Sequence, residues 1–165
     1  MSFAGIGYDS HRLAQGRRLI LGGVEIPGAE LGLEGHSDAD VLTHAVIDAL
    51  LGAAGMGDIG EHFPDTDERW RDADSIELLK DVMAKLSIAG LEVVNVDCTV
   101  VMERPKLGPH RDQIRRRLAQ AIGLEEEQRV NVKATTGEGI GFVGRGEGVA
   151  ALAIASLGES GDPDE

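Results

Sequence analysis

The sequence predicts a two-layer α+β sandwich, in which a mostly antiparallel mixed sheet has helices on one face. The segments run in the order strand, hairpin, helix, helix, strand, helix, strand, strand, and helices mixed with a largely antiparallel sheet fit this class. The last predicted strand, 149–156, consists almost entirely of small apolar residues, as expected of a strand covered on both faces. Because a sheet with an apolar outer face needs a partner, we also expect an oligomer.

The first third of the chain predicts a strand, a hairpin and a helix. Residues 3–9 alternate in polarity, which is typical of a strand. A Gly-Gly pair between two short apolar runs predicts a hairpin over 18–26. After a loop, Ser37 is the predicted N-cap of a helix that continues to about Gly55.

The remainder of the chain completes one domain. The predicted elements are a loop over 57–69, a helix from Asp74 to Gly90, a strand over 91–102, a helix over 110–122, and strands over 129–135 and 149–156. We expect a single catalytic domain over residues 1–157. Residues 158–165 are polar and acidic, and we expect them to form a disordered tail.

Composition excludes several classes of function. The 165 residues suffice for one domain with a buried core, and the formal net charge of −13 argues against nucleic acid as the main partner. A small phosphorylated ligand stays compatible, because metal ions can neutralise it locally. No signal-peptide pattern or membrane-spanning run is found, so we expect a cytoplasmic protein with no membrane partner. The single Cys98 excludes an internal disulfide and is expected to be a buried small hydrophobe.

Asp9, His11 and His44 form the strongest candidate for a metal site. Side chains two residues apart on a strand point to the same face, so Asp9 and His11 can converge on one cation. His44, on the first predicted helix, could supply a second nitrogen. Two histidines and one aspartate with an open fourth position match a catalytic zinc site. The alternative is a hydrogen-bonded pair of histidines that serves only as scaffold.

Two further groups of residues suit a phosphorylated ligand. His36 lies near a predicted helix start, where free N–H groups and the helix dipole attract phosphate; the alternative is an ordinary capped helix with a chance histidine. Thr135 and Thr136 end a predicted strand and precede Glu138 and a Gly-rich loop. Their hydroxyls could hold phosphoryl oxygens while Glu138 holds Mg²⁺. The alternative there is a surface loop.

The segment 58–67 offers carboxylates to the hydroxyl groups of a ligand and a phenylalanine, Phe63, to cover it. His62 in this segment is expected to be a hydrogen-bonded loop histidine rather than a metal ligand. The sequence contains no pattern of a Ser-His-Asp triad, a paired-cysteine site or a Walker-type loop, which argues against a protein nucleophile.

A series of short motifs runs along the chain in a fixed order. They are Asp9-x-His11, Gly22-Gly23-Val24, His36-Ser37-Asp38-x-Asp40 with His44, Asp48-Ala-Leu-Leu-Gly-Ala-Ala54, Gly57-Asp-Ile-Gly60, Phe63-Pro-Asp-Thr-Asp67, Asn95-Val-Asp97, Pro105-Lys106, Asn131-Val-Lys-Ala-Thr-Thr136 and Gly141-Phe-x-Gly-Arg-Gly-Glu-Gly148. Over about residues 3–157 the chain resembles the 2-C-methyl-D-erythritol 2,4-cyclodiphosphate synthase family.

The resemblance implies a homotrimer with an active site between each adjacent pair of subunits. The implied reaction converts 4-diphosphocytidyl-2-C-methyl-D-erythritol 2-phosphate to 2-C-methyl-D-erythritol 2,4-cyclodiphosphate and CMP, as a phosphorus–oxygen lyase of the non-mevalonate isoprenoid pathway. The competing hypothesis is a non-catalytic trimeric module that binds zinc and a cytidine nucleotide. A purely structural trimer is the third possibility, and it leaves the polar loop 137–148 unexplained.

The resemblance also implies roles for individual residues. Asp9, His11 and His44 match zinc ligands, Glu138 matches the ligand of Mg²⁺ or Mn²⁺, and His36 and Thr136 match the pair that positions phosphates and stabilises the transition state. The implied substrate contacts are Ser37, Asp58, Ile59, Gly60, Phe63, Pro64, Asp65, Thr66, Asp67, Met102, Glu103, Arg104, Pro105, Lys106, Leu107, Gly108, Thr135, Gly137, Phe142 and Arg145. Gly137 departs from the many members that carry a side chain there, and we expect it to change loop stiffness rather than chemistry.

Overall fold

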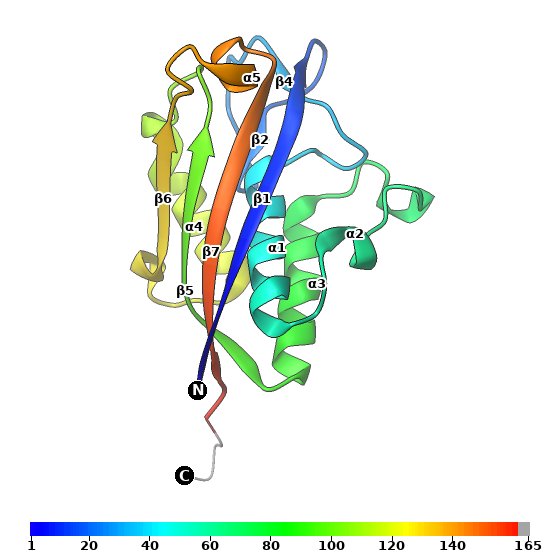
Figure 1. Cartoon of the computed structure of the whole chain (residues 1–165), viewed down its shortest axis with the longest axis vertical. Helices are drawn as coiled ribbons and strands as arrows, with labels where there is room; N and C mark the ends of the chain where they lie inside the picture. The colour runs from blue at the N-terminus through cyan, green and yellow to red at the C-terminus, as the bar shows by residue number, and fades with distance from the viewer. Residues whose placement is uncertain (162–165) are drawn as a thin grey trace.

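The computed structural model describes residues 1–161 and contains a sheet with helices on one side (Figure 1). Its strands are β1 (Ser2–Ala14), β2 (Ile20–Leu21), β3 (Val24–Glu25), β4 (Gly32–Leu33), β5 (Leu91–Val101), β6 (Val130–Thr135) and β7 (Gly148–Glu159). Its helices are α1 (Val41–Ala54), α2 (Ile59–His62), α3 (Ser75–Ile88), α4 (Arg111–Ile122) and α5 (Gly141–Gly144), with 3₁₀ turns η1 (Glu68–Trp70), η2 (Gly108–His110) and η3 (Glu127–Arg129).

The main sheet has the strand order β4-β1-β7-β5-β6. All neighbouring strands pair antiparallel except β5 and β6, which are parallel. In Figure 1, helix α4 lies behind the strands, and helices α1 and α3 are seen to the right of β1. The predicted α+β class with a mixed, mostly antiparallel sheet is therefore confirmed.

Two glycines on β1 allow α1 to lie directly against the sheet. A Cβ atom at Gly5 would lie 2.1 Å from the Ala49 carbonyl oxygen, and one at Gly7 would lie 1.9 Å from that of Ala45. Neither position can hold a larger residue at this separation of strand and helix. The close approach matters for function, because it brings the side chains of α1 within reach of the β1 residues that follow Gly7.

The start of α1 differs from the prediction. Ser37 is not the N-cap; the helix begins at Val41 with Asp40 as its cap. The Asp40 carboxylate accepts hydrogen bonds from the backbone and hydroxyl of Thr43, and from the amides of Gly22 and Gly23 in the hairpin turn. This carboxylate therefore joins the predicted hairpin, which is confirmed, to the helix start.

Two boundaries also differ from the prediction. The expected loop over 57–69 contains the short helix α2 and part of η1, because Asp58 and Asp67 each cap a helical turn. Strand β7 continues to Glu159, two residues beyond the predicted domain end, because Gly158 and Glu159 pair with the start of β5. The last part of the predicted tail, 162–165, lies outside the described residues.

The sheet face opposite the helices exposes apolar side chains. Ile6 and Tyr8 on β1 lie in register with Ile154 and Leu152 on β7. Ile6 is 69% exposed and Ile154 is 52% exposed. Such a contiguous apolar patch is typical of a surface that another protein chain covers.

The predicted burial of Cys98 is confirmed. Cys98 is buried, and burial raises the pKa of its thiol to about 12, so it is not a nucleophile near neutral pH. Within residues 1–161, every helix is too short or too polar to cross a bilayer.

Candidate metal centre

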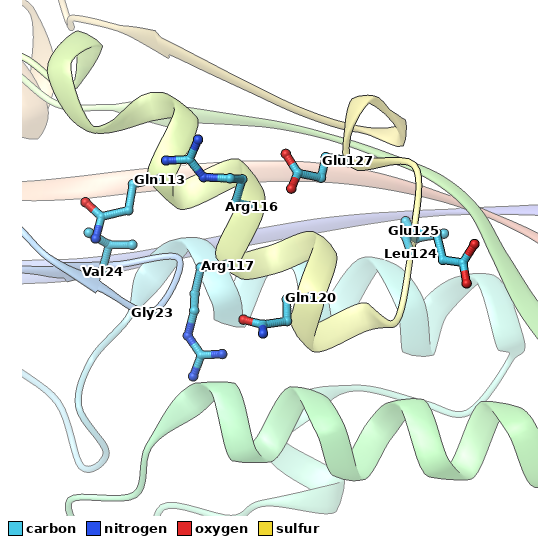
Figure 2. Close-up of a pocket in the computed structure, with 9 residues that line it drawn as sticks. All are labelled: Gly23, Val24, Gln113, Arg116, Arg117, Gln120, Leu124, Glu125 and Glu127. Atoms are coloured by element: carbon cyan, nitrogen blue, oxygen red, sulfur yellow. The ribbon is translucent and has the colours of Figure 1, made fainter.

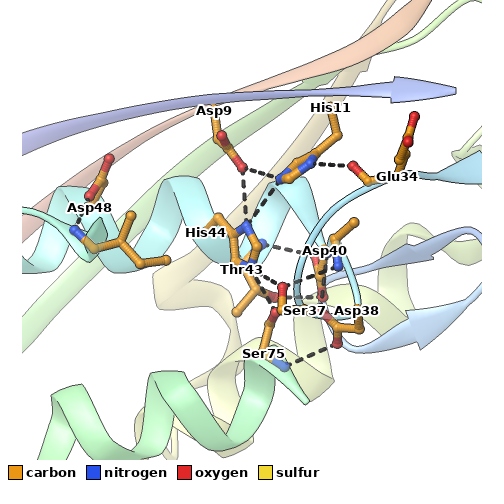
Figure 3. Close-up of polar contacts among 12 residues, drawn as sticks. Asp9, His11, Glu34, Ser37, Asp38, Asp40, Thr43, His44, Asp48 and Ser75 are labelled. Carbon is orange, nitrogen blue, oxygen red and sulfur yellow. Dashed lines mark hydrogen bonds and ion pairs between the residues drawn. The ribbon is translucent and has the colours of Figure 1, made fainter. Parts of the chain in front are cut away.

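Asp9, His11 and His44 meet where α1 crosses β1 (Figure 3). Asp9 Oδ2 lies 2.9 Å from His11 Nε2 and 3.1 Å from His44 Nδ1. The two imidazole nitrogens lie 3.3 Å apart. The predicted ligands therefore converge, and within residues 1–161 they form the one cluster of three or more candidate side chains with metal-binding geometry.

The outer nitrogen of His11 is held by a backbone oxygen. His11 Nδ1 lies 2.8 Å from the Glu34 carbonyl oxygen, which can only accept a hydrogen bond. Nδ1 therefore holds the proton, and the lone pair of Nε2 points toward Asp9 and His44. This is the usual arrangement of a metal-binding histidine, in which an outer hydrogen bond fixes the tautomer.

His44 is held in the same way by side chains. Its Nε2 lies 2.8 Å from Ser75 Oγ and 3.2 Å from Ser37 Oγ. The Ser75 hydroxyl donates its own proton to the Asp38 carboxylate, so its oxygen accepts from His44 Nε2–H. The lone pair of His44 Nδ1 then points into the cluster. Ser37, a predicted substrate contact, is buried and directs its hydroxyl toward His44.

Two nitrogen lone pairs and a carboxylate oxygen facing one another require a positive charge between them. When a proton rather than a metal ion is held between these groups, His11 and His44 become hydrogen-bond donors to Asp9; burial would raise the pKa of Asp9, but these hydrogen bonds outweigh burial and lower this pKa to about 2. Burial would lower the pKa of His11, but the hydrogen bond and charge of Asp9 outweigh it and raise this pKa. The cluster therefore stabilises a bound proton or a bound cation.

The geometry of the cluster fits a tetrahedral cation. Ligands at about 2.0–2.2 Å from one tetrahedral zinc ion lie roughly 3.3–3.6 Å apart. The separations of 2.9 to 3.3 Å between Asp9, His11 and His44 are close to this range. Three protein donors leave one coordination position for a ligand, which agrees with the predicted catalytic type of site.

The segment predicted to contact substrate, 58–67, is hydrogen-bonded to residues that neighbour His44 in the sequence. His36 Nε2 donates to the Asp67 carbonyl oxygen at 3.0 Å. At the other end of the segment, Asp48 on α1 accepts from the Ile59 amide at 2.8 Å. Phe63 is only 7% exposed, so most of its side chain packs into the protein, and its contact with a ligand stays a prediction.

Thr136 and Glu138 form a separate local pair after β6. The Glu138 amide donates to Thr136 Oγ1 at 3.1 Å, and both side chains are exposed. Glu138 has a φ of 52°, a left-handed conformation that is uncommon for a residue with a side chain. Such strain clusters at functional sites. A single exposed carboxylate of this kind suits Mg²⁺, which combines few protein ligands with phosphate oxygens.

The metal cluster and the Thr136–Glu138 pair do not meet within one chain. The sheet register aligns Asp9 with Ala151, Val100 and Ala134 on successive strands. Three strand spacings of about 4.8 Å separate β1 from β6 by roughly 14 Å. A single diphosphate is too short to contact both groups of one chain.

Part of the predicted substrate-contact segment 102–108 and helix α5 line a common cavity. The Glu103 carboxylate accepts a hydrogen bond from the Gly137 amide at 2.5 Å. This bond joins segment 102–108 to the loop that follows β6. A Cβ atom at Gly137 would lie 2.8 Å from the Gly144 amide nitrogen, so this loop packing explains the glycine. The cavity has a volume of about 690 Å³, and its walls include Glu103, Arg104, Pro105, Val143 and Arg145.

Another hollow, of about 680 Å³, lies between α4 and the β2–β3 turn (Figure 2). It brings Arg116 and Arg117 together with Glu125 and Glu127. None of its residues belongs to the predicted site.

Sequence reasoning missed the outer partners of the two histidines. Ser75 lies 31 residues after His44 and carries no motif of its own. Glu34 contributes only its carbonyl oxygen, which any residue could supply. Asp38 was noticed within a motif, but its contact with Ser75 was not predicted.

The chain matches a known protein family over almost its whole length. The model of the YgbB family matches residues 3–158. A 2-C-methyl-D-erythritol 2,4-cyclodiphosphate synthase from Alkaliphilus metalliredigens is 57% identical over 156 residues, covering 94% of this chain and 97% of that protein. A bifunctional enzyme IspD/IspF from Anaeromyxobacter sp. is 59% identical over 153 residues, and the match covers 93% of this chain but 39% of that protein.

A solved structure agrees with these matches. The CDP-bound form of a 2C-methyl-D-erythritol-2,4-cyclodiphosphate synthase has a TM-score of 0.85 and 39% identity, covering 94% of this chain and 99% of that one. The chain therefore belongs to the YgbB family.

Proposed function

We propose that the chain converts 4-diphosphocytidyl-2-C-methyl-D-erythritol 2-phosphate to 2-C-methyl-D-erythritol 2,4-cyclodiphosphate and CMP. The observation that supports this most is the Asp9–His11–His44 cluster, because both imidazole lone pairs point inward and one coordination position is free. The relatives' names and the CDP-bound relative support a cytidine diphosphate-linked substrate. The proposal includes the phosphorus–oxygen lyase class, the isoprenoid pathway and a cytoplasmic setting.

The proposed reaction is an intramolecular phosphoryl transfer. An oxygen of the 2-phosphate attacks the β-phosphorus, a new P–O bond closes the ring, and the bond to the bridging oxygen breaks so that CMP leaves. Both reacting groups are anions, so catalysis consists mainly of positioning and charge stabilisation. No protein nucleophile is needed, in agreement with the raised pKa of Cys98.

Asp9, His11 and His44 would hold zinc and Glu138 would hold Mg²⁺ or Mn²⁺, and these ions would supply Lewis-acid stabilisation of the diphosphate oxygens. His36, fixed by the Asp67 carbonyl, would orient the phosphate beside the cluster. The exposed Thr136 hydroxyl would donate to a phosphoryl oxygen. These two residues are the proposed catalytic pair.

We infer that each active site is built from two chains of a homotrimer. The separation of roughly 14 Å across the sheet supports this, since one diphosphate cannot reach both groups of a single chain. The exposed apolar face around Ile6 and Ile154 supports a sheet-to-sheet contact between subunits. The exposed Ile140 and Phe142, beside the Glu138 loop, fit a surface that faces a neighbouring chain.

The competing proposal, a non-catalytic zinc- and cytidine-binding module, is tested by one assay. The zinc-loaded protein is incubated with the diphosphocytidyl substrate and Mg²⁺, and phosphorus NMR follows the formation of the cyclic diphosphate and CMP. We expect turnover with the wild type and with His110→Gln, a control outside the cluster, but not with His44→Ala. Zinc and CMP binding without release of CMP from the substrate would favour the module.

A further inference from the structure

One lysine of α3 fastens the segment Asp58–Trp70, here called the substrate loop. Lys85 Nζ lies 3.1 Å from His62 Nδ1 and 5.1 Å from the centre of the Phe63 ring. Asp81, one helical turn earlier, holds the same ammonium group at 2.9 Å. Lys85 is half-buried, so its ammonium group is directed along the loop rather than into open solvent.

The proton positions on His62 suit this contact. His62 Nε2 lies 2.7 Å from the Met56 carbonyl oxygen and must donate to it. His62 Nδ1 therefore has a lone pair that accepts from the Lys85 ammonium group. The predicted hydrogen bonding of His62 is confirmed, although His62 ends helix α2 rather than lying in a loop.

Aromatic packing links the Lys85 contact at Phe63 to Trp70 at the end of the substrate loop. The rings of Phe63 and Trp70 meet edge to face, with centres 5.1 Å apart and an interplanar angle of 85°. Phe63 is buried, so this ring contact links the interior of the protein to Trp70 at the end of the substrate loop. Residues 63–67 are therefore held at their start by Lys85 and at their end by the His36–Asp67 hydrogen bond.

We propose that Lys85 is a positioning residue for substrate binding. It holds the substrate loop in one arrangement before substrate arrives, which reduces the entropy lost when the loop contacts the substrate. This inference rests on the proposed function. Neither Lys85 nor His62 belongs to the motifs that identify the family, and both act through the loop rather than on the reacting atoms.

The free protein offers a direct test, because Trp70 is the only tryptophan of the chain and lies at the end of the loop. Its Nε1 is buried and has no hydrogen-bond partner among residues 1–161, so loosening of the loop would expose it to water. We expect Lys85→Met to shift Trp70 emission to longer wavelength and to raise acrylamide quenching about twofold. Lys85→Arg should restore the wild-type signal, because arginine keeps a cation and N–H donors.

The matched control is Lys80→Met on the same helix; within residues 1–161 the Lys80 ammonium group forms an ion pair with the exposed Glu77 and none with the substrate loop. It should leave Trp70 fluorescence unchanged. His62→Leu should act like Lys85→Met, and the double variant should change quenching by less than the sum of the two, because both substitutions break the same contact. Circular dichroism checks that all variants fold.

Steady-state kinetics then separate positioning from a purely structural role. Lys85→Met should raise KM about three- to tenfold, as expected for losing one charged hydrogen bond and one cation–π contact, with little change in kcat. Unchanged Trp70 quenching in folded Lys85→Met protein would overturn the proposal, as would a raised quenching with unchanged KM. Absence of turnover in the wild type would count against the proposed function alone, because the fluorescence result does not depend on turnover.

Discussion

Replacing Ser75 with alanine removes the oxygen that fixes the tautomer of His44. The Ser75 hydroxyl accepts from His44 Nε2–H at 2.8 Å and donates to Asp38. Loss of such an outer partner costs about 10- to 100-fold in metal affinity. Ser37 Oγ remains at 3.2 Å as a second acceptor, so we expect about 10- to 30-fold weaker zinc binding, or roughly 1.4–2 kcal/mol.

The assay is a zinc titration in competition with a chromophoric chelator, which gives the dissociation constant directly. Ser87→Ala is the matched control, because Ser87 is exposed near the end of the same helix. Thermal unfolding of the metal-free protein measures the accompanying loss of stability, about 1–2 kcal/mol, which is expected when Asp38 loses a donor. A folded Ser75→Ala protein with the dissociation constant of the wild type would refute this reasoning.

Three further predictions address the fold, the second cation and pH. Gly7→Ala should lower the free energy of unfolding by about 3 kcal/mol, because the new Cβ atom would clash with α1. Gly52→Ala should stabilise the protein by up to about 1 kcal/mol, because the nearest atoms to its Cβ would lie 3.9 Å away. Urea unfolding measures both variants, and equal effects would contradict the packing argument. Glu138→Ala should reduce turnover by about 100-fold or more, only partly restored by added Mg²⁺, and loss of bound zinc in this variant would show that the two cation sites were confused. In zinc-free protein the pKa of Asp9 is lowered from 3.8 to about 2. Its contribution of about 2 kcal/mol to the free energy of unfolding is therefore present above pH 4 and is lost as the pH falls toward 2. Asp9→Asn should remove this acid sensitivity, and identical pH profiles of stability for the wild type and Asp9→Asn would contradict the prediction.

Local patterns were sufficient for much of the fold. The Gly-Gly hairpin turn and the α3 boundaries follow from turn and cap chemistry, and the structure agrees with them. The cap of α1 was wrongly predicted at Ser37, because both Ser37 and Asp40 satisfy the same local rule. Only the tertiary contacts of Asp40 with the hairpin turn decide between them.

The candidate site was predictable where a residue acts through its own chemistry. Asp9, His11 and His44 bring recognisable ligand types to positions that strand and helix geometry can align. Ser75 and Lys85 could not be found in this way, because their importance comes from neighbours distant in sequence. The inward packing of Phe63 was also hidden, since exposure depends on the whole fold.

The central claim is that one active site combines the metal cluster of one chain with Glu138 of another. Mixing the inactive variants His44→Ala and Glu138→Ala during refolding tests it directly. In a homotrimer assembled at random from equal amounts, one intact site forms in each mixed trimer, which predicts about a quarter of wild-type CMP release. A refolded mixture as inactive as either variant alone would contradict the claim.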